Sequence, residues 1–371
     1  MTDIKSVVSA KEFQRALEKV LKAAPKKSRL PFLPEAHISF GDGTCTLSCT
    51  DLEQWCQAVI PAQGGRCSFI LNDSRKLLSV CKYFSGDMEF SYQEDDPPET
   101  FPSKQELDGS LVLRCGSREL HQRVTAAGLF PELPELKTER TYTVDPASLS
   151  KRFERIKYAL ADDPSRPCNQ CVQFFDNRIG AVDGFRLAFS RDNSLCVDEP
   201  FFIPPAAMKL LPAFEGDICQ LSVGERYAMF DSGSVRVITS MPKGEGLNFD
   251  SAIPKDYTEE HAVDIADFVD NLRYLNEFIR YPTRDAIRFD GGVLSVKTVN
   301  GEYRSKLKLT DAPKTVYGFN GSYMLDGLKQ FQAKKLQVVA MQTGSNPYAP
   351  IVLTDQDDLA MVLPMRLKEA A

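Results

Sequence analysis

The chain has 371 residues, of which 43% are hydrophobic and 26% charged, an ordinary composition for a globular protein. At this length we expect two or three domains rather than one core. The sequence lacks the run of about 18 apolar residues that a membrane-spanning helix needs. Its amino terminus, MTDIKSVVSAKEF, lacks the basic-then-apolar pattern of a secretory signal. We therefore expect a cytoplasmic protein.

Amphipathic helical segments recur along the chain, two in each third. The spacing of apolar residues predicts six of them: Ala10–Lys22, Ser74–Phe84, Pro146–Tyr158, Pro205–Ala213, Ile265–Arg280 and Ser322–Phe331. Internal repetition of this kind predicts a symmetric architecture rather than a cleft with one active site.

Alternating strands accompany the helices and turn at equivalent places in each third. The predicted hairpin turns are Gly41–Gly43, Asp176–Asn177, Asp290–Gly292 and Asn300–Gly301. Linkers rich in proline and charge begin at Pro131 and surround Pro254. The pattern predicts an α+β protein with three similar domains of antiparallel sheets, each with two helices, at residues 1–138, 139–256 and 257–371.

The net charge is −6, but its distribution is uneven. The six helical segments hold 15 Lys or Arg and 7 Asp or Glu, so they carry +8 and the remainder of the chain carries −14. On a single helix, basic residues are ordinary solvated surface. Here the outer faces of five helices are net positive or mainly basic. Only in Ile265–Arg280 do acidic residues outnumber basic ones. An acidic chain with basic helices is compatible with a nucleic-acid partner.

The first predicted helix keeps its core residues and its basic residues on separate faces. Its apolar stripe comprises Phe13, Leu17, Val20 and Leu21, whereas Lys11, Arg15 and Lys19 recur every four positions elsewhere. In Pro146–Tyr158 we likewise expect Lys151 and Arg155 to point outward.

The 10 cysteines lie mostly in apolar contexts, where we expect them to be reduced and to pack as small hydrophobic residues. Cys168 and Cys171 form a lone C-x-x-C, and the three histidines are scattered. A zinc site needs a second ligand pair at suitable spacing, so we expect neither a metal nor a cofactor.

Four motifs together resemble a known family. They are TDLE (Thr50–Glu53), VDGFRLA (Val182–Ala188), FNGSYMLDGL (Phe319–Leu328) and LPMRL (Leu363–Leu367). With the threefold repeat, they resemble the bacterial sliding clamp, the beta subunit of DNA polymerase III. The resemblance implies two chains closed head to tail into a ring, with helices lining the hole and a continuous sheet outside. It implies a non-catalytic processivity factor of the bacterial cytoplasm and nucleoid. Its expected partners are double-stranded DNA, the polymerase alpha subunit, the clamp loader and other proteins with a clamp-binding motif.

The resemblance also implies three sets of site residues. The expected DNA-contact residues are basic side chains, which suit sequence-independent contacts with phosphates. They are Lys11, Arg15, Lys19, Lys26, Lys27, Arg75, Lys151 and Arg155. A pocket for partner peptides would use Cys168, Val182, Gly184, Phe185, Leu187, Leu247, Asn320, Tyr323, Val362, Leu363, Pro364, Met365, Arg366 and Leu367. The dimer contact would place Leu120 of one chain against Phe278 and Ile279 of the other. The family usually has histidine where Phe185 stands.

Two other functions stay open at this point. One is a hydrolase that uses Asp183 and Arg186, or Asp51 and Glu53 as paired carboxylates on the exposed face of a strand. The sequence contains no G-x-S-x-G motif, Walker loop or histidine pair to support it. The other is a protein-binding scaffold that does not load onto DNA, for which the basic helices would have no use.

Overall fold

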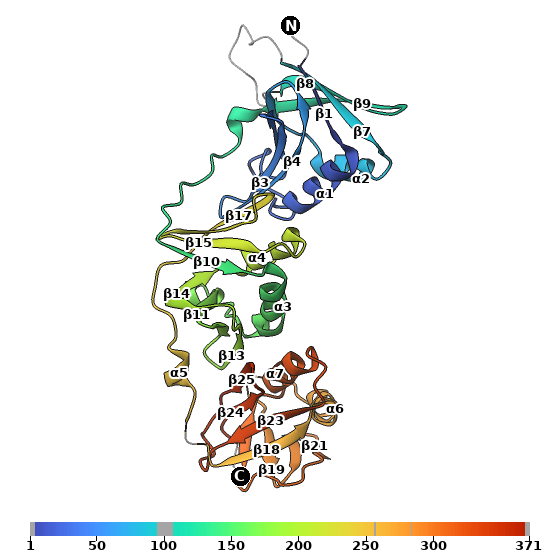
Figure 1. Ribbon diagram of the computed structural model, residues 1–371. Coiled ribbons are helices and arrows are strands. Elements are labelled where there is room, and N and C mark those ends of the chain that lie inside the picture. The colour runs from blue at the N-terminus through green and yellow to red at the C-terminus, as the bar shows by residue number, and fades with distance from the viewer. Residues whose placement is uncertain (1–3, 95–106, 256, 283, 368–371) are drawn as a thin grey trace. The chain divides into compact units, whose positions relative to one another are not determined.

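The computed structural model of the protein describes residues 4–94, 107–255, 257–282 and 284–367 (Figure 1). The chain forms two compact units. Unit 1 comprises residues 1–147 and 206–241, and unit 2 comprises residues 148–205 and 242–371. Residues 139–256, expected to form the second of three domains, are divided between the two units. The three-domain division therefore stays a prediction.

Unit 1 is built on a single sheet of 13 strands in the order β10-β15-β16-β17-β4-β3-β2-β6-β9-β8-β7-β1-β5. The strands are β1 (Ile4–Ser9), β2 (His37–Gly41), β3 (Thr44–Thr50), β4 (Gln54–Pro61), β5 (Gln63–Gly64), β6 (Cys67–Ile70), β7 (Asp87–Glu94), β8 (Leu107–Cys115), β9 (Arg118–Ala126), β10 (Arg140–Val144), β15 (Cys219–Val223), β16 (Tyr227–Asp231) and β17 (Val235–Ser240). Neighbouring strands pair antiparallel, as predicted.

Helix α1 (Ala10–Val20) shows how the sequence forms the helical layer of unit 1. The Ser9 hydroxyl caps its first turn by accepting a hydrogen bond from the amide of Glu12. Phe13, Leu17 and Val20 are fully buried, which confirms the predicted stripe. Each such side chain contributes roughly 1.5–3 kcal/mol through burial. The helix packs on β3 and β4 and against α2 (Ser74–Cys81).

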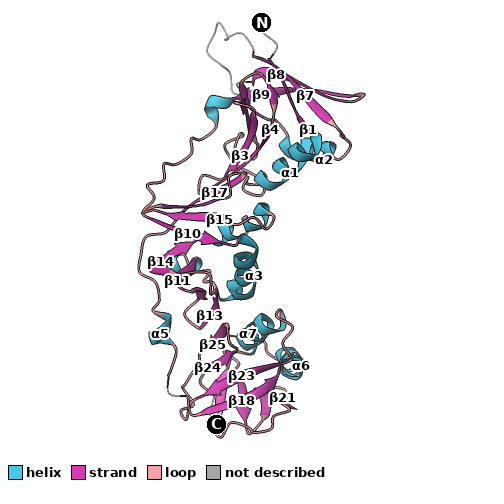
Figure 2. Cartoon of the chain, in the orientation of Figure 1, coloured by secondary structure: helices cyan, strands magenta, loops and turns pink. Residues whose placement is uncertain are grey.

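Unit 2 contains two sheets, one of eight strands in the order β14-β11-β12-β13-β25-β24-β23-β18 and one of four in the order β21-β20-β19-β22. The strands are β11 (Val172–Asp176), β12 (Arg178–Val182), β13 (Arg186–Arg191), β14 (Val197–Ile203), β18 (Glu259–Asp264), β19 (Ile287–Asp290), β20 (Val293–Thr298), β21 (Gly301–Lys306), β22 (Tyr317–Phe319), β23 (Val338–Thr343), β24 (Ile351–Thr354) and β25 (Asp358–Val362). The helices and strands are distinguished by colour in Figure 2.

The helices of unit 2 are α5 (Phe249–Ala252), α6 (Ile265–Asn276), α7 (Gly321–Gln332) and most of α3 (Pro146–Ile156), which begins in unit 1. Asp264 caps α6 and Asn320 caps α7 through their side-chain oxygens. The two helices pack together and bury Phe268, Leu272 and Phe331 in one core. Five of the six predicted helices are thus present, within a few residues of their expected ends.

The predicted helix Pro205–Ala213 is wrong in extent. It consists of one helical turn, α4 (Pro205–Met208), followed by a separate 3₁₀ turn at Leu211–Phe214. Pro212 explains the break, because proline has no amide hydrogen to donate to residue 208 and its ring would collide with that carbonyl.

The predicted hairpin turns are all confirmed, and their residues have the backbone conformations that such turns need. Asp42 and Asp176 adopt positive φ values of 49° and 48°, and Gly291 and Gly292 adopt 55° and 84°. These values lie in the left-handed region, which aspartate tolerates and glycine favours.

The last strand of the chain is not at an edge of its sheet. β25 lies inside the eight-stranded sheet, between β13 and β24. The partner motif Leu363–Leu367 follows it as an extended segment, held along β22 by a bond from the Met365 amide to the Gly318 carbonyl (2.7 Å). Pro364 lacks an amide donor, so the ladder with β13 cannot continue through it.

Most cysteines fill the core as expected. All ten are free, eight of them are buried, and Cys168 and Cys171 pack with Phe202. Burial raises the pKa of Cys56 and of Cys81 to about 12, so these thiols stay protonated and unreactive near neutral pH.

Candidate peptide-binding and nucleic-acid interfaces

The motifs VDGFRLA and LPMRL, far apart in the sequence, lie side by side in unit 2. β13 pairs with β25, and the Leu363 amide donates to the Phe185 carbonyl at 2.9 Å. Val182, Leu247 and Leu363 pack against the apolar cluster that contains the buried Leu187. The structure therefore brings four of the predicted pocket residues into a common wall.

A tight turn between β12 and β13 presents Phe185. Asp183 Oδ1 accepts bonds from the amides of Phe185 (2.9 Å) and Arg186 (3.0 Å). Gly184 has a φ of 91°, a conformation that residues with a Cβ rarely adopt. The turn is thus fixed by its own residues, and it leaves the Phe185 side chain exposed.

Arg186 connects this turn to α7. Its Nε donates to Asp183 (2.8 Å) and its Nη1 donates to Asp326 (2.9 Å). The guanidinium lies over the ring of Tyr323 at 4.3 Å and over that of Tyr158 at 5.3 Å. The Arg186 guanidinium therefore contacts the turn before β13, the turn after α3 and helix α7 at once.

These contacts argue against the hydrolase alternative. The side chains of Asp183 and Arg186 are each only 13% exposed and are bonded to each other, so Asp183 is not free to act as a base. Asp51 likewise uses its carboxylate to accept bonds from the amides of Glu53 and Gln54. It lies in the turn between β3 and β4, so the expectation that Asp51 and Glu53 share the exposed face of a strand is wrong.

The remaining predicted pocket residues fall into different environments. Met365 and Leu367 lie against Gly318, where a Cβ would come within 2.4 Å of the Met365 carbonyl. Asn320 is 4% exposed and is used to cap α7 and to bond the Pro282 carbonyl, so its visible role is structural. Val362 belongs to the core beneath α7, and Cys168 to the separate cluster with Phe202. Arg366 is exposed.

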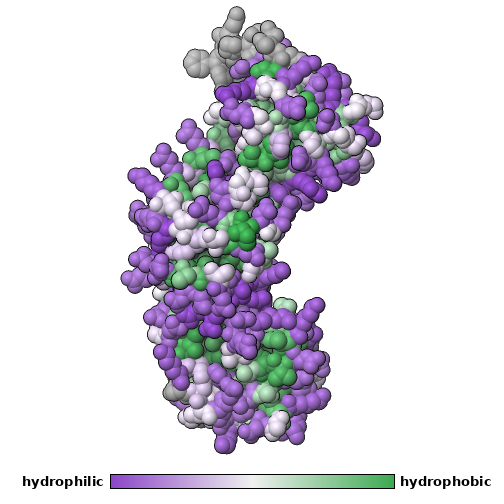
Figure 3. Space-filling model, in the orientation of Figure 1, coloured by the Kyte–Doolittle hydropathy of each residue, from purple (hydrophilic) through white to green (hydrophobic). Residues whose placement is uncertain are grey.

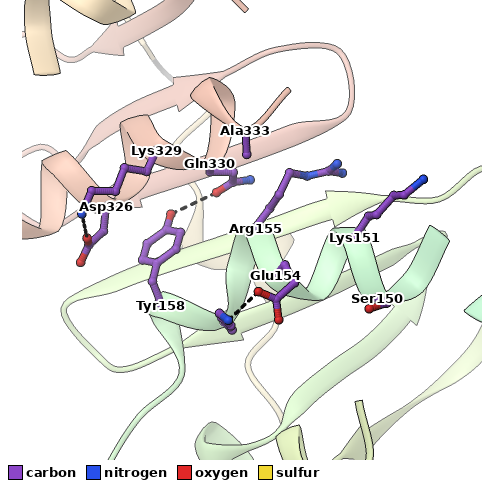
Figure 4. Close-up of a pocket in the computed structure, with 10 residues that line it drawn as sticks. Ser150, Lys151, Glu154, Arg155, Tyr158, Asp326, Lys329, Gln330 and Ala333 are labelled. Atoms are coloured by element: carbon purple, nitrogen blue, oxygen red, sulfur yellow. Dashed lines mark hydrogen bonds and ion pairs between the residues drawn. The ribbon is translucent and has the colours of Figure 1, made fainter. Parts of the chain in front are cut away.

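A groove of about 590 Å³ lies between α3, with the turn that follows it, and α7 (Figure 4). It is lined by Ser150, Lys151, Glu154, Arg155, Lys157, Tyr158, Asp326, Lys329, Gln330 and Ala333. The sequence pointed to only Lys151 and Arg155 among these as site residues. Lys157 and Lys329 belong to the basic residues counted on the helices, and that count is the one signal that could have found them.

Arg155 does not point freely outward, contrary to expectation. Its side chain is 16% exposed, and its Nε lies 3.1 Å from Oδ2 of the buried Asp358. Its Nη2 also donates to the Ser190 hydroxyl at 2.8 Å. A buried carboxylate needs a cation beside it, and Arg155 meets that need. Lys151 is exposed.

In unit 1, five predicted DNA-contact residues are exposed: Lys11, Arg15, Lys26, Lys27 and Arg75. Arg75 on α2 donates to the carbonyl of Ala24 at 3.0 Å, which holds α2 beside the loop that carries Lys26 and Lys27. Lys19 differs, because its side chain is 18% exposed and its ammonium lies 3.2 Å from Glu215.

The predicted dimer residues lie on or next to strands with a side that pairs with no other described strand. Leu120 lies on β9, and over Arg118–Gln122 this strand pairs with β8 alone within the described residues. Phe278 and Ile279 pack partly against the core of unit 2. The Phe278 ring stacks on Tyr303 of the edge strand β21, with centroids 3.6 Å apart and planes 10° from parallel.

Among the residues that the structure describes, no group of three or more His, Cys, Asp or Glu side chains is arranged to hold a metal ion. No described helix is long and apolar enough to cross a membrane. The surface in Figure 3 is largely hydrophilic in both units and is interrupted by apolar patches.

No protein-family model matches the chain. It is 23% identical over 396 aligned positions to the beta sliding clamp of Synechococcus elongatus, and the alignment covers 98% of this chain and 100% of that protein. The DNA polymerase III beta subunit of Thermotoga maritima has a similar structure, with a TM-score of 0.81, 20% identity and coverage of 98% and 100%. The DNA polymerase sliding clamp of Caulobacter crescentus is also similar, with a TM-score of 0.82 and 18% identity. The match covers 98% of this chain and 100% of that one.

The fold is therefore that of the DNA sliding clamps. Within this class, the resemblance to the bacterial beta sliding clamp that four motifs indicated is confirmed, because relatives with that name align along nearly the whole chain.

Proposed function

We propose that this chain is a DNA sliding clamp, a non-catalytic processivity factor that encircles duplex DNA. The observation that carries the proposal is the agreement between full-length likeness to beta sliding clamps and the local geometry of unit 2. There, one of two distant motifs with the clamp pattern extends into β13, and the other directly follows β25, the strand that pairs with β13.

The charge pattern supports contact with DNA. A protein that slides must attract phosphates without reading base edges, since base contacts would hold it at one sequence. Lys11, Arg15, Lys26, Lys27 and Arg75 are exposed on or beside the helices of unit 1, and Lys151 is exposed on α3. We expect the attraction to be sequence-independent and to weaken with salt. Lys19 and Arg155 contribute less, because each already has an acidic partner.

The apolar wall of Val182, Leu187, Leu247 and Leu363 supports a site for a short, extended partner peptide. We expect glutamine- and leucine-containing segments of the polymerase alpha subunit, the clamp loader and other proteins with a clamp-binding motif to dock there. A ring that moves along DNA needs one reusable site that several enzymes occupy in turn.

The sides of β9 and β21 that pair with no other described strand support a head-to-tail homodimer. An exposed strand edge tends to pair with another chain, and closing a ring of two chains would cover these edges. In this proposal Leu120 of one chain lies near Phe278 and Ile279 of the other, and the ring acts in the bacterial cytoplasm at the nucleoid.

The test combines mass in solution with retention on DNA. At micromolar concentration, light scattering should give twice the chain mass of 41.5 kDa. After loading by the cognate clamp loader, the protein should stay on nicked circular DNA through gel filtration and dissociate once the circle is linearised. A monomer, or equal retention on circles and linear DNA, would contradict the ring. A dimer that binds partner peptide but is never retained on circles would favour the scaffold alternative.

A further inference from the structure

Residues 244–254, the connecting segment, lie between β17 and β18 and contain the short helix α5 (Figure 1). Leu247 of the apolar wall stands just before this helix. A helix of four residues is too short to be stable by itself in water. The position of the connecting segment therefore depends on its contacts with the rest of unit 2.

Arg178 on β12 holds α5 through a bidentate ion pair. Its Nη1 donates to Oδ1 of Asp250 at 2.7 Å, and its Nη2 donates to Oδ2 at 2.9 Å. The planar guanidinium matches the two oxygens of a carboxylate, so the pair is directional and stronger than a hydrogen bond between neutral groups. Hydrogen bonding to Arg178 lowers the pKa of Asp250, which keeps this carboxylate ionised at neutral pH.

Arg178 is itself held in one position. Its guanidinium lies over the ring of Phe175 at 4.5 Å and over that of Phe189 at 5.3 Å, and its side chain is only 10% exposed. Its Nη2 also donates to Oδ2 of Asp176 at 2.5 Å. An arginine that its neighbours restrict in this way loses little conformational entropy when it binds Asp250.

Two neighbouring contacts extend the attachment to Leu247. The Phe249 ring stacks on Phe175 with centroids 4.5 Å apart, and a Cβ at Gly180 on β12 would come within 2.6 Å of it. Gln173 on β11 donates from Nε2 to the Leu247 carbonyl at 2.9 Å. Strands β11 and β12 thus place the connecting segment, and Leu247 with it.

We infer that Arg178 is a positioning residue of the peptide site: it latches the connecting segment to β12, so that Leu247 completes the apolar wall. Arg178 acts through Asp250 and does not contact the peptide. The inference rests on the proposed function, because it assigns a role in the same peptide site.

The two acids that share Arg178 provide a matched comparison. Asp250 belongs to the connecting segment and Asp176 to β11, and their side chains are 61% and 63% exposed. Asparagine at either position removes one charge with little change of size, and it tolerates the positive φ of 48° at Asp176. If Arg178 served only the stability of unit 2, Asp250→Asn and Asp176→Asn would act alike.

Three measurements are made on the full-length protein. Hydrogen exchange followed by mass spectrometry reports local opening of the connecting segment. Fluorescence anisotropy gives the affinity for a fluorescein-labelled heptapeptide that contains one glutamine and two leucines, and thermal unfolding gives the stability.

Asp250→Asn should speed exchange in residues 244–254 and weaken peptide binding about three- to fivefold, the range of a partly exposed ion pair. Asp176→Asn should leave both unchanged, while the unfolding temperature falls by a similar small amount in the two variants. Arg178→Lys keeps the charge but lacks the fork, so it should act like Asp250→Asn. Combining these two changes should weaken binding no further, because both remove the same contact.

The outcomes separate this inference from the proposed function. Equal effects of Asp176→Asn and Asp250→Asn overturn the positioning role, and so does faster exchange without weaker binding. Weaker binding without faster exchange overturns it too, because Asp250 would then contact the peptide directly. Each of these results leaves the peptide site standing. Failure of the peptide to bind the unaltered protein overturns the peptide site and the positioning role with it, whereas retention on circular DNA tests the ring separately.

Discussion

Arg186, the first residue of β13, donates a hydrogen bond from Nη1 to Oδ2 of Asp326 on α7 at 2.9 Å, although 140 positions separate them in the sequence. The bond joins the VDGFRLA motif to the FNGSYMLDGL motif within unit 2. Both side chains are largely withdrawn from water, and such charge-assisted bonds are stronger than exposed ion pairs. The relative position of Phe185 and Tyr323 depends on this connection.

Replacing Arg186 with lysine should weaken peptide binding. Lysine has no planar fork, so it cannot hold Asp183 and Asp326 together while lying over Tyr323. We expect a three- to tenfold reduction of affinity, or about 1 kcal/mol, with a similarly small reduction of stability. Peptide titration by anisotropy and thermal unfolding measure the two effects. The control is Arg191→Lys, which alters a guanidinium that donates to the Gln356 carbonyl at 3.2 Å. Equal reductions in both variants would refute a specific role for Arg186.

Met365→Ala should reduce peptide affinity by about 1–2 kcal/mol, or roughly five- to thirtyfold, if Met365 supplies part of the floor of the site. The side chain is half-buried, and the backbone at this position stays bonded to Gly318, so the fold should tolerate the change. Met229→Ala on β16 of unit 1 removes a half-buried methionine outside the site and should not alter affinity. Unchanged affinity in folded Met365→Ala protein would place the site elsewhere.

Reversing the charge at Lys11, Arg15 and Lys26 should reduce retention on circular DNA and flatten its dependence on salt. In a plot of the logarithm of DNA affinity against the logarithm of salt concentration, the loss of one phosphate contact makes the slope shallower by about 0.9. Circular dichroism should be unchanged, because all three side chains are exposed.

The matched control reverses three exposed basic residues outside the helices: Arg66, Lys255 and Lys314. It changes the net charge by the same amount. If the control reduced retention to the same degree, the effect would come from overall charge rather than from the positions on α1 and in the loop after it. A strong preference of the unaltered protein for one duplex sequence would contradict sliding.

His37 should make unit 1 less stable in mild acid. Its ring stacks on Phe130 at 4.8 Å and its Nε2 lies 2.7 Å from the Ser68 hydroxyl, and burial lowers its pKa from 6.5 to about 4. The unfolded chain therefore binds a proton more readily than the folded one. The stabilisation from neutral His37 is complete above pH 6.5 and is lost as pH falls toward 4.

Urea unfolding at pH 7 and pH 5 measures this effect. Between these values the His37 contribution should fall by on the order of 1–2 kcal/mol. His37→Gln, which cannot take up the proton, should show a correspondingly smaller difference between the two pH values. The same pH dependence in both proteins would mean that His37 does not protonate on unfolding.

Much of the secondary structure was predictable because its signals are local. Ser9, Asp264 and Asn320 stand where helix caps are required, and the turn at Asp290–Gly292 contains residues that accept positive φ. The helix expected over Pro205–Ala213 failed because Pro212 prevents its continuation, a local signal that the apolar spacing concealed.

The candidate site was predictable only in part. Resemblance identified the motifs, and their residues do lie together on β13 and in the segment after β25. It did not reveal that Asn320 is occupied in capping α7, or that Cys168 packs apart from the apolar wall. Both facts depend on contacts with residues outside the motifs, such as Pro282 and Phe202, which the motifs do not specify.

The sequence alone determined the repeated helices and hairpins, the basic character of the helices and the resemblance to sliding clamps, since periodicity, turn chemistry and motif order are written along the chain. Only the tertiary structure decided which charges are free. Lys19 is paired with Glu215 and Arg155 with Asp358, partners 196 and 203 positions away, and β25 is enclosed between β13 and β24. A buried carboxylate is stable only next to a cation, and packing between distant segments, not the local sequence pattern, determines which cation lies beside it.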